Sequence, residues 1–428
     1  MITSNDRCTT SEPTPAIVLG VEHPRAVAVV QSLGRMGVSV IGVDHDRAAR
    51  GMYSRYIKEK IFVGESHDRA VATLESLTRY RGAVLIATND HYLTLVAQNF
   101  ERLSRCFTLT MPPWEVVSTL MDKKRCYTLA RSIGLNVPCF FAPASVEELD
   151  HVIAELDFES HAYILTKTLP TGEPTDGSTR RFTRVAGLDA HTVRARCLEV
   201  MARTGDLPMI AEVVPGQSDT CVGVSLILDR SHATVAWYCV KRLQLRPYKK
   251  DEGFIHPYEL GANVHCESTH DDEAVDGASR LLRAAGYYGA ATVEFRRDIA
   301  DGTLKLIKVD PRFVRATSLS AALRVDLPSV LFRVFTGKSV TIPKSYPDGV
   351  AWIWLTWYLD TVRQRGLGSA RRRLGALLRE ASRIRAVAYL SKHDQMPFLV
   401  DVSRWARASL KRDLSHVARR LRLASPQG

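Results

Sequence analysis

The chain has 428 residues, 45% of them hydrophobic and 24% charged, which is the composition of an ordinary globular protein of two or three domains. The formal net charge is +12, but residues 349 to 428 hold 16 Lys and Arg against five Asp and Glu, so nearly all of the excess lies in this last segment. A polar N-terminus, no apolar run of membrane length and eight scattered cysteines without a Cys-x-x-Cys pair argue against a secreted, membrane-spanning, disulfide-rich or zinc-binding protein, and we expect a cytoplasmic one.

The first hundred residues predict a parallel α/β domain. Ala16–Gly20 is a short apolar strand, residues 24–36 read as a helix, and residues 38–43 read as a second strand. This βαβ order predicts parallel strands. A further strand is expected at 83–87, and we place the first domain at 1–115. The turn after the first strand lacks the G-x-G-x-x-G pattern, which argues against dinucleotide binding there.

The middle of the chain contains a lysine at a strand end and a loop rich in small and basic residues. The strand Tyr163–Lys167 ends in that lysine, and the loop follows at 169–184. Backbone N–H groups of such a loop can close over phosphates, and a solvated hairpin loop is an equally good interpretation. Other expected elements are a helix ending at Ile133, strands at 208–214, 222–229 and 233–241, and a helix at 271–286.

The segment Thr292–Phe313 carries the strongest chemical signal. Two apolar runs flank an Asp-Gly turn at 301–302, which predicts a β-hairpin. Glu294 lies on the first strand, and Asp310 and Arg312 lie at the end of the second. Carboxylates are ligands for magnesium, and arginine suits a transferring phosphoryl group. The alternatives are an edge-strand carboxylate and a structural salt bridge.

Short motifs in a fixed order along the chain resemble the ATP-grasp superfamily. They are Asp122-Lys123 at a helix start, Ile133–Pro138, Lys167 at a strand end, Glu212–Gly216, Lys241-Arg242, Val293–Phe295 and Asp310–Phe313. The resemblance covers about residues 16–400 and is closest to the stand-alone carboxylate–amine ligase-like group. The segments Ala386–Tyr389 and Met396–Leu399 also resemble that group.

This resemblance implies an α/β fold, an α+β clamp in which ATP is held between two sheets. It implies an ATP-grasp domain at 116–344 with a lid at about 125–210, followed by a basic helical extension at 345–428. The implied enzyme is a ligase that joins a small-molecule carboxylate to an amine through an acyl phosphate. Its cofactors would be ATP and one or two magnesium ions.

The resemblance also implies roles for individual residues. Lys123 and Lys167 would hold phosphates, Ala211, Glu212 and Val214 would read adenine through the backbone, and Asp219, or equally Ser218, would take the ribose hydroxyls. Lys241-Arg242 fits a basic position near the phosphates, and Lys241 and Arg312 are the expected catalytic residues; Glu294 and Asp310 are the expected metal ligands. The alternative for the lysines is a surface position at a helix start or strand end.

One residue departs from the family pattern. Where the family usually has a glutamate that bridges two metal ions, this chain has Lys308, and Asp310 stands where an asparagine is usual. Three outcomes follow: Lys308 replaces the charge of one magnesium, Lys308 points away in a salt bridge, or the site binds nucleotide without turnover.

The sequence of the C-terminal segment allows two interpretations of what the segment contacts. Val350–Leu359 holds three tryptophans, and Arg371–Arg373 lies in the basic region that follows. We favour a helical cap that packs Trp and Leu on the core, and peripheral membrane contact is the alternative. No nucleic-acid motif is present, and a homodimer is compatible with the sequence. The alternative function for the whole chain is a degenerate ATP-binding scaffold with a regulatory or partner-binding role.

Overall fold

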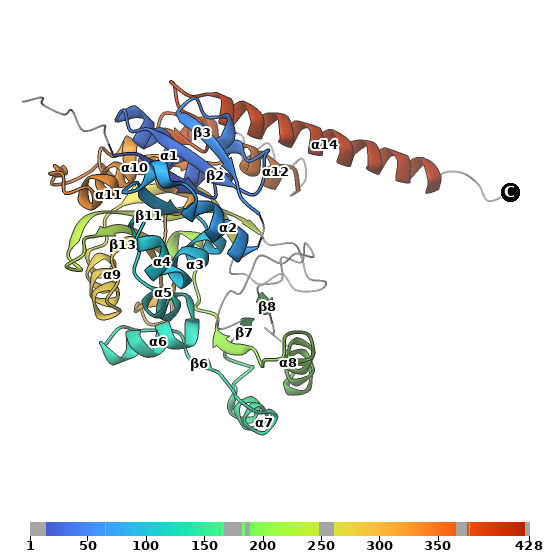
Figure 1. The fold of residues 1–428 in the computed structure, drawn as a ribbon. Helices are drawn as coiled ribbons and strands as arrows, with labels where there is room; N and C mark the ends of the chain where they lie inside the picture. The colour runs from blue at the N-terminus through green and yellow to red at the C-terminus, as the bar shows by residue number, and fades with distance from the viewer. Residues whose placement is uncertain are drawn as a thin grey trace, which may run out of the picture.

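The structure, a computed structural model, describes residues 14–64, 66–161, 163–166, 182–184, 189–247, 261–364, 375 and 377–423. These residues form three β-sheets flanked by helices, with one long C-terminal helix that extends away from the rest of the chain (Figure 1). The seven cysteines of this part of the chain form no disulfide.

The N-terminal sheet is parallel throughout and has the order β3-β2-β1-β4-β5. Its elements are β1 (Ala16–Leu19), α1 (Pro24–Arg35), β2 (Val40–Asp44), η1 (Arg50–Tyr53), β3 (Ile57–Phe62), α2 (His67–Glu75), η2 (Thr78–Tyr80), β4 (Val84–Ala87), α3 (Asp90–Gln98), α4 (Phe100–Ser104) and β5 (Thr108–Leu109). The strands are buried apolar runs, and Asn89 caps α3 by accepting a hydrogen bond from the Tyr92 N–H. The predicted βαβ opening is confirmed.

The smallest sheet is antiparallel, with the order β6-β9-β7-β8. The elements of this region are α5 (Trp114–Met121), α6 (Lys123–Ser132), β6 (Phe140–Phe141), α7 (Val146–Glu155), β7 (Tyr163–Thr166), β8 (Phe182–Arg184), α8 (Ala190–Thr204) and β9 (Met209–Glu212). Asp122 caps α6, and Gly205 ends α8 in the left-handed conformation that glycine favours. Strands β6, β7 and β8 fall within residues 125–210, where the lid is expected.

The largest sheet has seven strands in the order β14-β13-β10-β11-β12-β15-β16. Its region contains η3 (Ser218–Thr220), β10 (Cys221–Leu228), β11 (Thr234–Pro247), β12 (Gly261–Thr269), α9 (Asp272–Ala284), β13 (Gly289–Arg297), β14 (Leu304–Asp310), η4 (Arg315–Thr317), α10 (Ser318–Ala322) and α11 (Leu327–Phe335). Neighbouring strands are antiparallel except β15 and β16. The predicted hairpin at 301–302 is the β13–β14 connection.

The last segment was expected to be helical, and this expectation is wrong in part, because the segment adds two strands to the largest sheet. It contains β15 (Ala351–Ile353), α12 (Leu355–Gln364), β16 (Ile384–Val387) and α14 (Met396–Leu423). β15 pairs with β12, and β16 pairs with β15. The tryptophan run at Val350–Leu359 is therefore a strand followed by a helix. Arg371–Arg373 lies outside the described residues.

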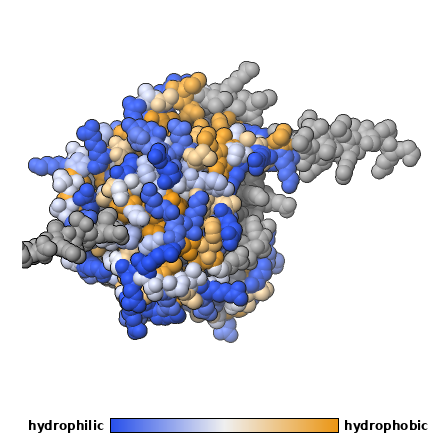
Figure 2. Space-filling view, turned by 45° about the horizontal axis from the view of Figure 1, so that its top comes forward, coloured by the Kyte–Doolittle hydropathy of each residue, from blue (hydrophilic) through white to orange (hydrophobic). Residues whose placement is uncertain are grey.

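The surface near α14 is mixed in character. Three of its large apolar side chains, Met396, Leu399 and Leu410, are at least half exposed, and apolar atoms lie among hydrophilic ones where α14 leaves the rest of the chain (Figure 2). Within the described residues no helix is both long enough and apolar enough to cross a membrane.

The two faces of the largest sheet have different roles. Val222, Val224 and Phe295 point to one face and pack in an apolar core with α9, α6 and the N-terminal sheet. Alternate residues point to the other face, where Ser225 and Thr292 share a hydrogen bond of 2.9 Å between their hydroxyl oxygens. This second, polar face of β13 and β14 carries the candidate site.

Candidate functional site

The strand register places the predicted carboxylates on one face of the β13–β14 hairpin. Glu294 on β13 pairs with Lys308 on β14. Thr292, two residues before Glu294, pairs with Asp310, two residues after Lys308. Because residues two apart on a strand share a face, the side chains of Glu294, Lys308 and Asp310 gather on the polar side of the sheet. The cluster that the sequence predicted is present, with Lys308 at its centre.

All four carboxylate oxygens of Glu294 and Asp310 are paired with cations. Lys308 Nζ lies 2.8 Å from Asp310 Oδ2 and 3.5 Å from Glu294 Oε1. Arg242 pairs with Glu294 Oε2, and Arg312 Nη2 lies 3.1 Å from Asp310 Oδ1. Each carboxylate side chain is only 15% exposed, whereas Lys308 is 39% exposed. Lys308 therefore faces the site and bridges the two strands.

These cations keep both carboxylates ionised. Burial acts to raise the pKa of Asp310, but the charges of Lys308 and Arg312 outweigh it and hold that pKa below its usual range. Burial likewise acts to raise the pKa of Glu294, and Arg242 and Lys308 lower it overall. At neutral pH the group is a set of fixed ion pairs.

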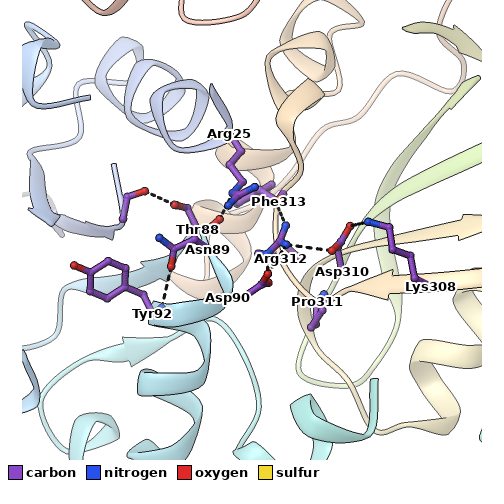
Figure 3. A network of polar contacts seen from close by, with 12 residues as sticks. Arg25, Thr88, Asn89, Asp90, Tyr92, Lys308, Asp310, Pro311, Arg312 and Phe313 are labelled. Atoms are coloured by element: carbon purple, nitrogen blue, oxygen red, sulfur yellow. Dashed lines mark hydrogen bonds and ion pairs between the residues drawn. The ribbon is translucent and has the colours of Figure 1, made fainter. Parts of the chain in front are cut away.

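Arg312 connects this group to the N-terminal sheet through Asp90, a residue the sequence analysis did not single out. Arg312 Nε donates to Asp90 Oδ1 at 2.5 Å and Nη2 donates to Asp90 Oδ2 at 3.0 Å. Figure 3 shows Arg312 between Asp90 and Asp310, with Lys308 on the far side of Asp310. The only signal in the sequence was position: Asp90 follows β4, at the carboxyl edge of a parallel sheet, where ligands commonly bind.

Asp90 remains charged for the same reason as Asp310. Burial acts to raise the pKa of Asp90, and the charge and hydrogen bonds of Arg312 lower it below its ordinary value. Arg25, in the first turn of α1, is also near this group and donates from Nε to the Thr88 carbonyl oxygen. Arginine side chains from α1 and from just after the end of β14 thus converge on this group.

Lys123 lies at the start of α6, close enough to Lys308 for the two positive charges to interact. Burial and the neighbouring charge of Lys308 lower the pKa of Lys123 from 10.5 to about 8. Two ammonium groups thus interact unfavourably across the site. An anion placed near both would relieve this interaction, which is the property expected of a phosphate site.

The adenine-binding stretch expected at Ala211, Glu212 and Val214 lies at the end of β9, beside the hairpin. Arg296 Nη1 donates to the Val214 carbonyl at 3.1 Å, and Lys305 Nζ lies 3.8 Å from Glu212 Oε1. Both cations lie on the same hairpin as the Lys308 group. The structure therefore places the predicted adenine and phosphate residues along one face.

The structure does not bring Lys241 into this cluster. Lys241 pairs in register with Val222, whose side chain belongs to the apolar core on the opposite face of the sheet, and its Nζ lies 2.9 Å from Glu267 Oε1. Arg242, one residue later, points to the Glu294 face instead. Side-chain alternation therefore gives the position near the carboxylates to Arg242 and not to Lys241.

Asp219 also lies away from the cluster. It lines a cavity of about 540 Å³ together with Lys241, Val222 and Arg297. Its position therefore gives no support to the expected contact with ribose. Lys167 and most of the loop at 169–184 lie outside the described residues, so the role expected of Lys167 stays a prediction.

The donor set at Glu294 and Asp310 does not fit a magnesium ion. Magnesium requires carboxylate oxygens at about 2.0–2.1 Å, and all four oxygens here are already paired with Lys308, Arg242 or Arg312. In the part of the chain that the structure describes, no group of three or more His, Cys, Asp and Glu side chains is arranged to hold a metal ion. The expected ligands are thus part of an ion-pair network.

No protein-family model and no curated protein matches the sequence. Solved structures do resemble the fold. N5-carboxyaminoimidazole synthetase from Staphylococcus aureus matches with a TM-score of 0.57 and 14% identity over 78% of this chain and 80% of that chain. The biotin carboxylase domain of 2-oxoglutarate carboxylase from Hydrogenobacter thermophilus matches with a TM-score of 0.58 and 14% identity over 78% and 73% of the two chains.

L-amino acid ligase from Bacillus licheniformis gives a similar result, with a TM-score of 0.53 and 14% identity over 76% of this chain and 75% of that chain. All three are ATP-grasp enzymes. Identity at this level establishes the fold and not the reaction. The predicted α/β class and clamp architecture are confirmed, and this chain adopts the fold of the ATP-grasp superfamily.

Proposed function

We propose that this protein is an ATP-dependent ligase that joins a carboxylate to an amine. The observation that carries the proposal is the row of cationic side chains along the polar face of the β13–β14 hairpin, in a chain with the ATP-grasp fold. Phosphoryl transfer needs positioning and positive charge around the phosphates more than any covalent participation by the protein. This face supplies both.

The residues have separate tasks in this proposal. Backbone groups of residues 211–214 hold adenine, as the family resemblance implies, and Lys123, Lys308 and Arg242 hold the phosphates. Arg312 steadies the transferring phosphoryl group, and Asp90 fixes the direction of its guanidinium through two hydrogen bonds. Lys167 is proposed as a further phosphate ligand on the family pattern alone.

The proposed reaction proceeds in two steps. A carboxylate oxygen of the first substrate attacks the γ-phosphorus of ATP. The bond between that phosphorus and the β-γ bridging oxygen breaks, which gives ADP and an acyl phosphate. The amine nitrogen of the second substrate then attacks the acyl carbon, phosphate leaves with the electrons of the C–O bond, and the nitrogen loses a proton. One amide, ADP and inorganic phosphate result.

The similar structures support this class of reaction. One is an L-amino acid ligase, and another was solved with MgADP, ADP and bicarbonate. Ligation and adenine-nucleotide binding are thus each found in a protein of similar fold. The substrates of this chain are proposed only as a class, a small carboxylate and a small amine.

The test is an ADP-release assay over pools of amino acids, other carboxylates and amines, with the products identified by mass spectrometry. We expect ADP release that depends on both a carboxylate and an amine, and we expect Arg312→Ala to lower kcat roughly 100-fold or more. Arg297→Ala is the matched control, because Arg297 lies on the same hairpin and pairs with Glu273 at 2.9 Å, away from the cluster. Equal loss in both variants would contradict the assignment of Arg312.

A second candidate function is supported by the ion pairs of Lys308. Because Lys308 pairs with both carboxylates, the site also fits a protein that binds nucleotide without turning it over and acts as a regulatory scaffold. Nucleotide binding with no ADP release over the whole substrate panel would favour this candidate. Absence of nucleotide binding would contradict both.

A further inference from the structure

We propose that the hairpin face binds the polyphosphate of a nucleotide without a divalent metal ion, with the Lys308 ammonium supplying the positive charge that a metal would otherwise bring. This inference rests on the proposed function, because it concerns how the same site neutralises phosphate. It differs from that function in predicting that nucleotide binding is independent of magnesium.

The first argument is geometric. The ammonium of Lys308 lies within 2.8 Å and 3.5 Å of carboxylate oxygens from two adjacent strands, which is the bridging position of a cation. A metal ion at this position would need the same two oxygens at about 2.1 Å. The ammonium and the metal are therefore alternatives, and the ammonium is covalently fixed to the chain.

The second argument is that the remaining oxygens are also used. Glu294 Oε2 is paired with Arg242, and Asp310 Oδ1 is paired with Arg312 at 3.1 Å. Arg312 is itself held by Asp90 and is only 8% exposed. If the Lys308 side chain moved away, a metal ion in its place would lie between two carboxylates whose other oxygens are still paired with guanidinium groups.

The third argument is the charge of the group. Three carboxylates, Asp90, Glu294 and Asp310, are matched by Lys308, Arg242 and Arg312, and the Arg25 guanidinium brings a further positive charge near Asp90 and Asp310. A site with a net positive charge attracts a polyphosphate and repels a free divalent cation. The charge of this group therefore favours a phosphate chain over a free metal ion at the hairpin face.

The experiment measures the Kd of ATP and ADP by isothermal titration calorimetry in EDTA and in excess Mg²⁺, at equal ionic strength. For the unaltered protein we expect the two Kd values to agree within about threefold, since no metal contact is lost. ATP binding that is about tenfold or more weaker in EDTA would overturn this inference and leave the ligase proposal intact. Absence of binding in both buffers would overturn the proposed function as well.

Lys308→Glu provides the sharpest variant, because it adds a third carboxylate beside Glu294 and Asp310. We expect this variant to lose ATP affinity in EDTA at least about tenfold and to regain it with Mg²⁺ or Mn²⁺. Direct titration with Mn²⁺ alone, followed by electron paramagnetic resonance, should show a bound ion in the variant and none in the unaltered protein. Micromolar Mn²⁺ binding by the unaltered protein would contradict the proposal.

Two further variants separate this effect from misfolding and from general charge. Lys308→Gln removes the ammonium without adding a carboxylate, so it should weaken ATP binding in both buffers without creating a Mn²⁺ site, while the thermal transition shows that the chain is folded. Lys338→Glu makes the same charge change at an exposed lysine after α11, outside the site. If Lys338→Glu changes ATP binding as much as Lys308→Glu, the specific role of Lys308 is wrong.

Discussion

At the scale of single residues, the identity of position 308 changes which ions the hairpin attracts. A glutamate there would add a third carboxylate to Glu294 and Asp310, and such a set binds divalent cations. Lysine instead pairs with both carboxylates and leaves the group with no free carboxylate oxygen. Of the three outcomes that the sequence left open for Lys308, the salt bridge is present, but it lies within the site and not away from it.

Asp90→Asn tests the positioning of Arg312. The substitution keeps the shape of the side chain and removes the negative charge that holds the guanidinium through two hydrogen bonds. We expect the free energy of unfolding to fall by roughly 1.5–3 kcal/mol, measured by urea denaturation, and kcat to fall while the Kd of ATP changes little. Asp68→Asn is the matched control, because Asp68 is also an acidic residue in the first turn of a helix beside the same sheet but is exposed. Equal effects of the two substitutions would contradict the account.

The lowered pKa of Lys123 makes nucleotide binding pH-dependent. With a pKa of about 8, Lys123 is partly neutral at pH 8.5, and a bound phosphate favours the charged form. Nucleotide binding at pH 8.5 should therefore be accompanied by uptake of a fraction of a proton by Lys123. The affinity for the nucleotide should fall as the pH rises further. Cys126 does not interfere, because burial raises its pKa to about 12.

Calorimetry at pH 8.5 in two buffers of different ionisation enthalpy measures this proton uptake. Lys123→Met should abolish this proton uptake. Lys124→Met, a change at the exposed neighbouring lysine, should leave the proton uptake intact. The same uptake in Lys123→Met as in the unaltered protein would show that another group binds the proton.

At the scale of elements, the β13–β14 hairpin is held at its start by a close backbone approach. Gly289 has φ +105°, and a Cβ atom at this position would lie 2.0 Å from the Thr110 carbonyl oxygen, which belongs to the segment after β5. This contact fixes the strand that carries Glu294 against the N-terminal part of the chain. Asp90, on that part, can then reach Arg312.

Gly289→Ala should therefore destabilise the protein much more than Gly302→Ala. Gly302 also has a positive φ, +74°, but a Cβ atom there would meet no atom within 4 Å, so only the backbone cost of roughly 1 kcal/mol applies. For Gly289→Ala we expect a loss of about 3 kcal/mol or more, because backbone must move. Denaturant unfolding of both variants measures the difference, and equal losses would show that the Thr110 contact is easily relaxed.

The elements also show how far the sequence could predict this protein. The βαβ opening, the end of β9 and the hairpin were predictable because each has a local signal: apolar runs, a Pro-Gly stop and an Asp-Gly turn. The position of Lys241 relative to Arg242 was not, because β11 has register shifts after Arg242 and the sequence does not show which face each side chain takes. The Arg312–Asp90 pair joins residues 222 positions apart, and no local pattern encodes such a contact.

At the scale of the whole molecule, the C-terminal segment ties the largest sheet to the N-terminal sheet. β15 and β16 extend the largest sheet, while Asp394, before α14, accepts hydrogen bonds from Ser54 Oγ at 2.6 Å and Gln31 Nε2 at 3.1 Å. Asp401 on α14 accepts from Thr356 Oγ1 at 2.6 Å and pairs with Arg50 Nε at 2.8 Å. These long-range contacts could not be predicted from a segment that reads as basic and helical.

Deleting residues 345–428 should therefore destabilise the protein by several kcal/mol, which corresponds to a fall in Tm of roughly 10 °C or more. Deleting only 413–428 keeps β15, β16, Asp394 and Asp401 and should leave Tm nearly unchanged. Differential scanning calorimetry of both shortened proteins gives the comparison. If the larger deletion keeps its Tm and loses only binding to anionic liposomes, the segment is a membrane arm and the structural role is wrong.

The central claim is that a nucleotide lies along the polar face of the β13–β14 hairpin with Lys308 on its phosphates. A crystal structure of the protein grown with ADP and EDTA tests it most directly. The account predicts a phosphate oxygen about 3 Å from Lys308 Nζ and the adenine against residues 211–214. A nucleotide in the cavity of Asp219 and Lys241, on the other face of the sheet, would contradict it.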